Sequence, residues 1–346
     1  MERKMTIQQA IQKVVALQNL ERNEARDVMG EIMDGAATPA QIGSLVTALR
    51  MKGETAAEIT GFAETMRAKA NRVSTEQMNL LDTCGTGGDG ADTFNISTCS
   101  AIVAAAGGIR VAKHGNRAMS SKSGSADVLE ALGVSISLTG EQAARCLDEV
   151  GICFMFAQLY HQSMKHAAAP RKEVGIRTIF NLLGPLTNPA GADRQVLGIF
   201  DKDKTELIAE VLRDLGIKRG LVVASFDGLD EISICDATKV TELKDGDLRT
   251  YEITPDFLGL RASSLSEVKG GDAKHNAEMI RSVFAGSLGA PRDIVLANAG
   301  ACFYVTGLCA TLQEGVKLAA NVIDSGKAAE KLQQLVHFTG EISHVS

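Results

Sequence analysis

Apolar positions in the first seventy residues follow helical spacing. The apolar residues between Ile7 and Val15 recur three or four positions apart, which places them on one face of a helix. Thr38-Pro39 puts a capping residue before a proline at the first helical position, and Gly53 follows the end of that helix. Thr55-Ala56-Ala57-Glu58 has the spacing of a capping box. The pattern contains no strand, so it predicts a small helical domain.

From about residue 79, short apolar runs alternate with helical patterns such as 205–215. The runs that predict strands are 79–83, 109–112, 134–138, 152–156, 196–200 and 221–225. Two further runs within 241–253, joined by Asp245-Gly246, predict a β-hairpin. Strands that alternate with helices favour a mostly parallel central sheet flanked by helices. The predicted fold class is α/β, with a small N-terminal helical domain and a larger α/β domain.

Composition and charge exclude several classes of protein. Hydrophobic residues make up 45% of the 346 positions, which excludes a disordered chain, and the net charge of -6 leaves no bulk positive field for nucleic acid. The 7 cysteines show no CxxC spacing and the N-terminus has no apolar signal segment, so we expect reduced thiols and a cytoplasmic protein. Residues 294–313 carry no charge, but Asn298, Gly300 and Gln313 interrupt them, so we predict a buried helix and no membrane span.

A glycine-rich segment follows the first predicted strand. Residues 85–90 contain four glycines, and Ser97-Thr98 can cap the helix that follows, an arrangement typical of an anion-binding cradle. Gly85-x-Gly87-x-x-Gly90 formally matches the dinucleotide-binding fingerprint. In that fold, however, the next strand ends in an acidic residue, whereas here it ends in Lys113-His114. No Lys-Ser/Thr pair follows the glycines, which excludes a Walker loop.

A second candidate loop runs from Lys113 to Ser125, after the next predicted strand. It contains three Lys or Arg residues, four serines and two glycines. Loops at the carboxyl ends of parallel strands are where α/β proteins bind ligands. Glycine and serine allow close backbone approach and hydroxyl donors, while Lys113 and Arg117 supply charge-assisted hydrogen bonds. We therefore predict a ligand-binding loop and not a solvated basic one.

Together the two segments resemble the anthranilate phosphoribosyltransferases. The resemblance extends over essentially the whole chain, and its motifs are Asp82-Thr83-Cys84-Gly85-Thr86-Gly87-Gly88-Asp89, Asn95-Ile96-Ser97-Thr98, Lys113-His114-Gly115-Asn116-Arg117, Arg177-Thr178-Ile179-Phe180-Asn181-Leu182-Leu183-Gly184-Pro185-Leu186-Thr187-Asn188-Pro189 and Asp227-Gly228-Leu229-Asp230-Glu231. It implies transfer of the phosphoribosyl group of 5-phosphoribosyl 1-pyrophosphate to the amine of anthranilate. The products would be N-(5-phosphoribosyl)anthranilate and pyrophosphate, in the second step of tryptophan biosynthesis from chorismate.

The resemblance also implies a domain division, a homodimer formed through the helical domain, and a set of ligands. We assign residues 1–72, with about 164–190, to the helical domain, and 73–163 and 191–346 to the α/β domain that would bind the sugar substrate. The sugar pyrophosphate would contact Gly85, Gly88, Asp89, Thr93, Asn95, Ile96, Ser97, Thr98, Lys113, His114, Gly115, Asn116, Arg117, Ala118, Met119, Ser120, Ser121 and Ser125. Mg²⁺ would be held by Ser97, Asp230 and Glu231, which suits a hard ion that prefers oxygen ligands.

Anthranilate would contact Gly85, Asn116 and Arg171 by the same resemblance. An arginine can bind a benzoate carboxylate with two parallel hydrogen bonds. In the family a proline stands two residues before this arginine, whereas here Pro170 immediately precedes it. We expect Pro170 in the first turn of the helix that follows.

The chemistry of the implied reaction asks for no dedicated catalytic acid or base. The amine of anthranilate is neutral at cytoplasmic pH, and the leaving group is a polyanion whose charge grows as its bond breaks. Binding energy is therefore best placed on that charge. His114 is the remaining candidate for a proton acceptor, and its alternative role is to donate hydrogen bonds to the ligand. His161 would line the anthranilate route by resemblance, or be a packed histidine.

Two other functions remain open from the sequence. The first is a pyrimidine nucleoside phosphorylase-like enzyme of the same general fold, although Gly115-Asn116-Arg117 after Lys113-His114 fits the anthranilate enzymes better. The second is a non-catalytic, nucleic-acid-binding paralogue. That function would need a basic surface, which the net charge of -6 and the intact Asp230-Glu231 pair do not favour. We therefore expect small-molecule substrates, with no nucleic acid and no membrane as partners.

Overall fold

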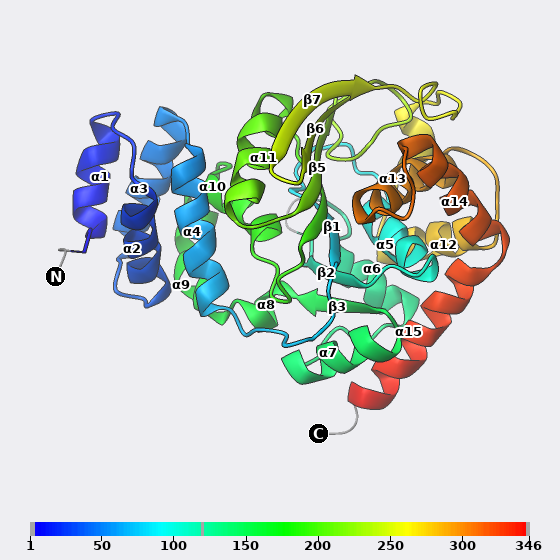
Figure 1. Ribbon diagram of the computed structural model, residues 1–346. Coiled ribbons are helices and arrows are strands. Elements are labelled where there is room, and N and C mark those ends of the chain that lie inside the picture. The colour runs from blue at the N-terminus through cyan, green and yellow to red at the C-terminus, as the bar shows by residue number, and fades with distance from the viewer. Residues whose placement is uncertain (1–3, 119–120, 344–346) are drawn as a thin grey trace.

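Threonine caps set the first helices of the chain. In the computed structural model, which describes residues 4–118 and 121–343, Thr6, Thr38 and Thr55 each accept a hydrogen bond from the backbone N–H three residues on. The Gln or Glu at that third position bonds back to the threonine N–H, which completes the capping box predicted at Thr55. The resulting bundle contains α1 (Ile7–Val15), α2 (Arg22–Met33), α3 (Pro39–Lys52) and α4 (Ala56–Lys69), against which α9 (Lys165–Val174) and α10 (Ile179–Leu183) pack (Figure 1).

A seven-stranded sheet in the order β3-β2-β1-β4-β5-β6-β7 lies beside the bundle. The first five strands in this order are parallel, while β6 and β7 form an antiparallel hairpin. Asp245 and Gly246 take positive φ at its turn, as predicted for this hairpin. The mostly parallel α/β class is confirmed. The strands are β1 (Leu81–Gly85), β2 (Val111–Gly115), β3 (Ile152–Phe156), β4 (Arg194–Gly198), β5 (Arg219–Ser225), β6 (Thr238–Lys244) and β7 (Asp247–Ile253).

Helices cover both faces of the sheet. Figure 1 shows α11 (Thr205–Asp214) between the sheet and the bundle, with α5 (Ile96–Ala106), α13 (Ala290–Thr306) and α14 (Leu312–Asp324) on the opposite side. The remaining elements are α6 (Ser125–Leu132), α7 (Gly140–Glu149), α8 (Ala157–Tyr160), α12 (Ala273–Phe284), α15 (Lys327–Ser343) and the short 3-10 turns η1 (Gln162–Met164), η2 (Gly184–Leu186), η3 (Lys202–Lys204) and η4 (Leu265–Val268).

The buried apolar residues form two cores, one on each face of the sheet. Val196 and Val223 belong to the core beneath α5 and α13, while their neighbours Leu197 and Val222 belong to the other. Successive side chains of a strand point to opposite faces, so a sheet covered on both sides needs apolar residues at consecutive positions. The second core continues through α11 into the bundle, and apolar packing therefore joins the bundle to the sheet.

The strand predicted over 134–138 is not formed. Val134, Ile136 and Leu138 are buried in alternation, but the segment has no strand partner. Two of its backbone groups are paired with side chains instead, since the Ser135 N–H donates to Thr339 Oγ1 and the Tyr160 hydroxyl donates to the Leu138 carbonyl. The alternation of buried and less buried residues here comes from an extended segment that packs on the helices. The hydrophobic pattern alone does not distinguish such a segment from a strand.

The uncharged stretch beginning at residue 294 forms most of the buried helix α13, as predicted. The helix ends at Gly307, which takes the left-handed conformation. Gly300 lies against Gly315 of α14 so closely that a Cβ on either glycine would overlap the backbone of the other helix. In the part of the chain that the structure describes, no helix has the length and apolar character needed to cross a bilayer.

Close packing of α2 on α4 generates the first prediction. A Cβ on Gly61 would overlap the Arg22 carbonyl oxygen, whereas a Cβ on Gly30 in α2 would meet nothing within 4 Å. Gly61→Ala should therefore lower the free energy of unfolding by about 1–3 kcal/mol through overpacking. Gly30→Ala should raise it by about 0.5–1 kcal/mol, because alanine costs less backbone entropy in a helix. Urea unfolding followed by circular dichroism measures both changes, and equal effects would contradict this account of the helix contact.

Candidate active site

The carboxyl ends of β1, β2, β4 and β5 meet at one edge of the sheet. Gly85 and Gly198 are register partners at the ends of β1 and β4. A Cβ on Gly198 would overlap the Asp230 carbonyl, and a Cβ on Gly85 would overlap the Asp230 carboxylate. Because these two positions are glycines, the loop after β5 can lie between the ends of the two strands. The expected strand 79–83 starts and ends two residues earlier than β1, so Gly85 belongs to the strand and not to the loop.

The glycine loop after β1 bends around this acidic residue. Gly87, Gly88 and Gly90 all take positive φ, a conformation that side chains disfavour, which explains the glycine density of the sequence. The Gly87 N–H donates to Asp230 Oδ2 at 2.6 Å. Asp89 accepts a hydrogen bond from the Ala91 N–H within the loop. The loop therefore presents backbone amides and a carboxylate around one small volume.

Asp230 and Glu231 form an acidic pair at this edge. The Ser97 N–H at the start of α5 donates to Glu231 Oε1 at 3.1 Å, so all three predicted metal ligands lie together. Burial, with the charge of Asp89 added, raises the pKa of Asp230 to about 7. Burial and the neighbouring Asp230 raise the pKa of Glu231 well above its ordinary value. Among the described residues no Lys or Arg forms an ion pair with either carboxylate, although the positive charge of Lys113 partly offsets the rise in the pKa of Glu231.

The chemistry of this donor set suits Mg²⁺. Two carboxylates and a hydroxyl supply only oxygen ligands, and Mg²⁺ commonly takes few protein ligands while retaining waters and substrate phosphates. The described residues contain no group of three or more His, Cys, Asp or Glu side chains able to enclose a metal ion. These residues thus suit a metal site that substrate or water oxygens complete, and not one in which protein side chains enclose the ion.

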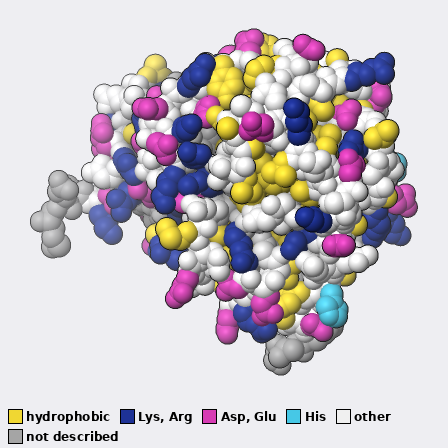
Figure 2. Space-filling model, turned by 45° about the vertical axis from the view of Figure 1, so that its right-hand side comes forward, with side chains coloured by type: hydrophobic (Ala, Val, Ile, Leu, Met, Phe, Trp, Pro, Cys, Tyr) yellow, Lys and Arg dark blue, Asp and Glu magenta, His cyan; other side chains and the backbone are white. Residues whose placement is uncertain are grey.

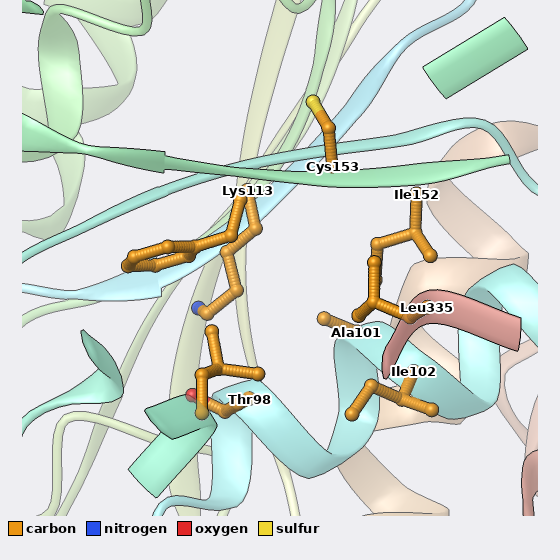
Figure 3. A pocket seen from close by; sticks show the side chains of 9 residues that line it. Thr98, Ala101, Ile102, Lys113, Ile152, Cys153 and Leu335 are labelled. Atoms are coloured by element: carbon orange, nitrogen blue, oxygen red, sulfur yellow. The ribbon is translucent and has the colours of Figure 1, made fainter. Parts of the chain in front are cut away.

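Lys113 is a buried cation beside the same edge. It was predicted just after a strand, but β2 extends to Gly115 and includes Lys113, which is only 4% exposed. Figure 3 shows its side chain leaving the strand toward α5, beside a small cavity lined mostly by apolar side chains. Its Nζ donates to the Thr83 carbonyl at 2.5 Å and to Ser97 Oγ at 3.3 Å. The ammonium is therefore fixed under the start of α5.

The loop from Asn116 to Gly124 is closed by a residue that the sequence did not single out. Asp127 Oδ2 accepts hydrogen bonds from the N–H groups of Ala118 and Gly124, both at 2.9 Å. Asn116 is exposed, and its carbonyl accepts a hydrogen bond from the Ser125 hydroxyl. The predicted contacts Met119 and Ser120 lie outside the described residues, whereas Ser121 is placed and exposed.

Arg117 does not face the glycine loop in this structure. Its guanidinium pairs with Asp127 at 2.9 Å and with Glu130 at 2.5 Å, and it lies over the Phe156 ring. These two carboxylates raise its pKa. Arg117 was expected to contact a phosphate, but its guanidinium is thus already paired with two carboxylates of α6. A phosphate would have to compete with those carboxylates for it.

Asn95 lies at the N-cap position of α5, but its side chain does not cap the helix. Its Nδ2 donates to the Ser123 carbonyl, while its Oδ1 accepts from the Ser123 hydroxyl and from Asn276 Nδ2 at 2.9 Å. Asn276, in α12, is buried and was not predicted, because nothing local in the sequence marks it. Thr93 bridges to Lys269, and Ile96 and Thr98 are buried in the first turn of α5. The two predicted loops are thus joined through Asn95.

His114 is buried beside His161, with ring centroids 5.0 Å apart. Burial, with the nearby His161, lowers the pKa of His114 to about 3, and burial lowers the pKa of His161 to about 4. The His114 backbone N–H donates to Asp82, a buried carboxylate that also accepts from Asn188 Nδ2 at 2.8 Å. His161 Nε2 contacts the Thr187 carbonyl at 3.0 Å. Both rings are therefore neutral near pH 7.

Arg171 lies in the last turn of α9, with its guanidinium over the Phe180 ring at 5.1 Å. Burial lowers its pKa. Pro170 was expected in the first turn of a helix, but it lies inside α9 because that helix begins five residues earlier, at Lys165. Within the described residues no hydrogen bond links Arg171 to Gly85 or Asn116, so a ligand would have to connect the three predicted anthranilate contacts.

Comparison with known proteins agrees with this geometry. Residues 8–70 match the family model described as "Glycosyl transferase family, helical bundle domain", and residues 77–329 match "Glycosyl transferase family, a/b domain". The chain is 54% identical over 337 residues to the anthranilate phosphoribosyltransferase of Brevibacillus brevis, covering 97% of this chain and 99% of that protein. It is 54% identical over 333 residues to that of Acetivibrio thermocellus, covering 96% of each chain.

Solved structures give the same result. The anthranilate phosphoribosyltransferase of Thermus thermophilus superposes with a TM-score of 0.91 at 44% identity, covering 95% of this chain and 99% of that one. The Saccharomyces cerevisiae enzyme in complex with PRPP and Mg superposes with a TM-score of 0.88 at 26% identity, covering 97% and 98%. Full-length matches at this identity show the family, and the chain belongs to the anthranilate phosphoribosyltransferases of this glycosyl transferase family.

Proposed function

We propose that the chain transfers the phosphoribosyl group of 5-phosphoribosyl 1-pyrophosphate to the amine of anthranilate, releasing pyrophosphate. The observation that carries this proposal is the meeting of the glycine loop, Lys113 and the Asp230–Glu231 pair at one edge of the sheet. The Saccharomyces cerevisiae relative has been solved with PRPP and Mg, and also with 4-fluoroanthranilate. The product would be N-(5-phosphoribosyl)anthranilate, in the second step of tryptophan biosynthesis from chorismate, in the cytoplasm.

The sugar pyrophosphate is assigned to the two loops joined by Asn95. Backbone amides of the glycine loop and the start of α5 suit the diphosphate, because amides and a helix N-terminus attract anions. Lys113, fixed below Ser97, adds positive charge. The loop from Asn116 to Ser121, with Ser125, suits the sugar and its 5-phosphate. Arg117 would join them only by leaving Asp127 and Glu130, which makes its role conditional on a rearrangement of the loop.

We assign Mg²⁺ to Ser97, Asp230 and Glu231. When bound, the ion would supply positive charge against the negative charge that grows on the leaving diphosphate. Burial and repulsion by Asp230 raise the pKa of Glu231, and the charge of the ion would also offset that repulsion. Asp230 itself is fixed by Gly85 and Gly198, so the ligand set is preorganised by the ends of β1 and β4.

The bond changes need no residue to remove a proton before attack. The lone pair of the neutral aromatic amine forms the new bond to C1, the C1–oxygen bond breaks, and its electron pair leaves with the diphosphate. The resulting ammonium loses its proton to solvent or to the departing diphosphate. His114, with a pKa of about 3, is a poor proton acceptor near pH 7, and its buried Nε2 has no protein partner within the described residues. We therefore assign it to ligand positioning.

A homodimer formed through the helical bundle is the proposed assembly. Val15, Leu17 and Met51 are 65%, 72% and 82% exposed. The segment after α1 that carries Leu17 is linked to the end of α3 by a hydrogen bond from Lys52 Nζ to Asn19 Oδ1 at 2.9 Å. On the face of the molecule in Figure 2, Lys and Arg side chains are interspersed with Asp and Glu, which does not favour the nucleic-acid-binding alternative.

Activity and the metal site are tested together. The wild-type protein should consume anthranilate, followed by its fluorescence, only when the sugar pyrophosphate and Mg²⁺ are both present. Asp230→Asn with Glu231→Gln should lower turnover by about 10²-fold or more, because the charge that supports the leaving group is lost. Asp236→Asn removes an exposed carboxylate after the same loop and should leave turnover unchanged. A double variant with wild-type activity and metal dependence would contradict the site.

Phosphorolysis of a pyrimidine nucleoside in place of anthranilate consumption would favour the phosphorylase alternative.

The anthranilate role of Arg171 predicts a selective effect on one substrate. Arg171→Ala should raise the KM for anthranilate by about tenfold or more, since a charge-assisted pair with its carboxylate is removed, while the KM for the sugar pyrophosphate changes little. Lys172→Ala, the exposed neighbour on the same helix, is the matched control. Steady-state kinetics with each substrate varied in turn measures the split. A larger effect on the sugar pyrophosphate would move Arg171 to the phosphate side.

The absence of a catalytic base predicts a mild effect at His114. His114→Gln should lower kcat by less than about 10²-fold, below the usual contribution of general acid–base catalysis. The wild-type kcat should show no ionisation between pH 5.5 and 8 that the variant abolishes, because burial keeps the imidazole neutral in this range. A loss of more than about 10³-fold, or disappearance of such an ionisation, would restore His114 as the proton acceptor.

A further inference from the structure

The guanidinium of Arg177 lies on the glycine loop. Its Nη2, Cζ and Nε atoms are 2.8, 3.0 and 3.1 Å from the position that a Cβ on Gly88 would occupy, so its flat face covers the bare Cα. Cζ also lies 4.1 Å from the centroid of the Phe200 ring, which follows β4. The guanidinium of Arg177 therefore packs against both a glycine and an aromatic ring.

This arrangement leaves the hydrogen-bonding edge of the guanidinium open. Arg177 is exposed, and within the described residues no carboxylate lies within 4.0 Å of its nitrogens. Arg117, by contrast, is paired with Asp127 and Glu130. Stacking uses the faces of a guanidinium, whereas its N–H groups point outward in the plane, toward ligands beside the stack.

Arg177 also connects the two parts of the molecule. It lies between α9 and α10, which pack on α3 and α4 of the bundle, whereas Gly88 and Phe200 follow strands of the sheet. A group bound by Arg177 and by the glycine loop would therefore contact both parts at once.

We propose that Arg177 binds the diphosphate of the sugar substrate through the open edge of its guanidinium. The inference rests on the proposed function, since it assigns a residue to the ligand of the same loop. Gly88 then has a second reason to be glycine, because any side chain would displace the guanidinium from its stack. Arginine suits the role because its planar fork can contact two phosphate oxygens simultaneously and stays charged at all relevant pH values.

The alternative is that Arg177 only supports the shape of the loop. A loop support would affect both substrates and thermal stability alike, whereas a diphosphate ligand affects the diphosphate alone. Lys202 offers a matched control on the same rim. Its ammonium lies 5.4 Å from the Phe226 ring centroid, a similar cation–aromatic pair that follows the neighbouring strand ends.

The experiment compares Arg177→Ala, Arg177→Lys and Lys202→Ala in the full-length protein. Arg177→Ala should raise the KM for the sugar pyrophosphate by about 10–100-fold, as expected for losing a charge-assisted pair, with less than about threefold change in the KM for anthranilate. Arg177→Lys should recover part of the loss, and Lys202→Ala should stay within about twofold of wild type. Calorimetric titration with inorganic pyrophosphate and Mg²⁺ should show the same ranking of affinities.

Each contrary outcome has a distinct meaning. Unchanged pyrophosphate affinity and KM in Arg177→Ala would overturn the inference, as would equal losses in Arg177→Ala and Lys202→Ala. Equal rises in both KM values with a lower melting temperature would assign Arg177 to loop support and also overturn it. A wild-type protein that binds pyrophosphate but does not consume anthranilate would contradict the proposed function alone, because the pyrophosphate titration still reports on Arg177.

Discussion

The site depends on two opposed glycines at the ends of neighbouring strands. Gly85 and Gly198 are register partners, and any Cβ on either would overlap Asp230. Because neither glycine has a side chain, the loop after β5 can lie between the ends of β1 and β4. This position brings Asp230 to the Gly87 amide and Glu231 to the first turn of α5. A larger residue at either position would push the acidic pair away from the glycine loop, and the anion cradle and its carboxylates would no longer share one edge.

A second constraint joins the bundle to this edge. Side chains from different elements donate hydrogen bonds to two backbone carbonyls of the segment 184–188, which lies between α10 and β4. Gln195 donates to the Pro185 carbonyl and Arg67 of α4 donates to the Leu186 carbonyl, both at 2.7 Å. Asn188 then reaches Asp82 and, through it, the His114 backbone. Buried carbonyls left without donors are costly, so these bonds favour one position of the segment and hence of the histidine pair.

Local chemistry allowed the sequence to predict the fold class and the glycine loop, whereas the individual ligand contacts were implied by the family resemblance and stay predictions. Capping boxes, the Asp245-Gly246 turn and the glycine density are set by neighbours in the chain, and the structure contains each of them. Contacts between residues far apart in the sequence could not be predicted. Asn276 meets Asn95 only through the packing of α12, and alternation over 134–138 could not reveal that the segment has no strand beside it.

The charges at this edge are arranged for a ligand that carries both signs. Asp89, Asp230 and Glu231 repel one another, and a free diphosphate would meet the same repulsion. The cations Lys113 and Arg177 lie around the same loop and would repel a lone metal ion. In the proposed assignment, a diphosphate bound together with a divalent cation would reduce both conflicts, because the metal would offset the charge of Asp230 and Glu231 while the phosphates would offset that of Lys113 and Arg177. The proposed binding of diphosphate and metal together would thus follow from the placement of five side chains around two glycine-bounded strand ends.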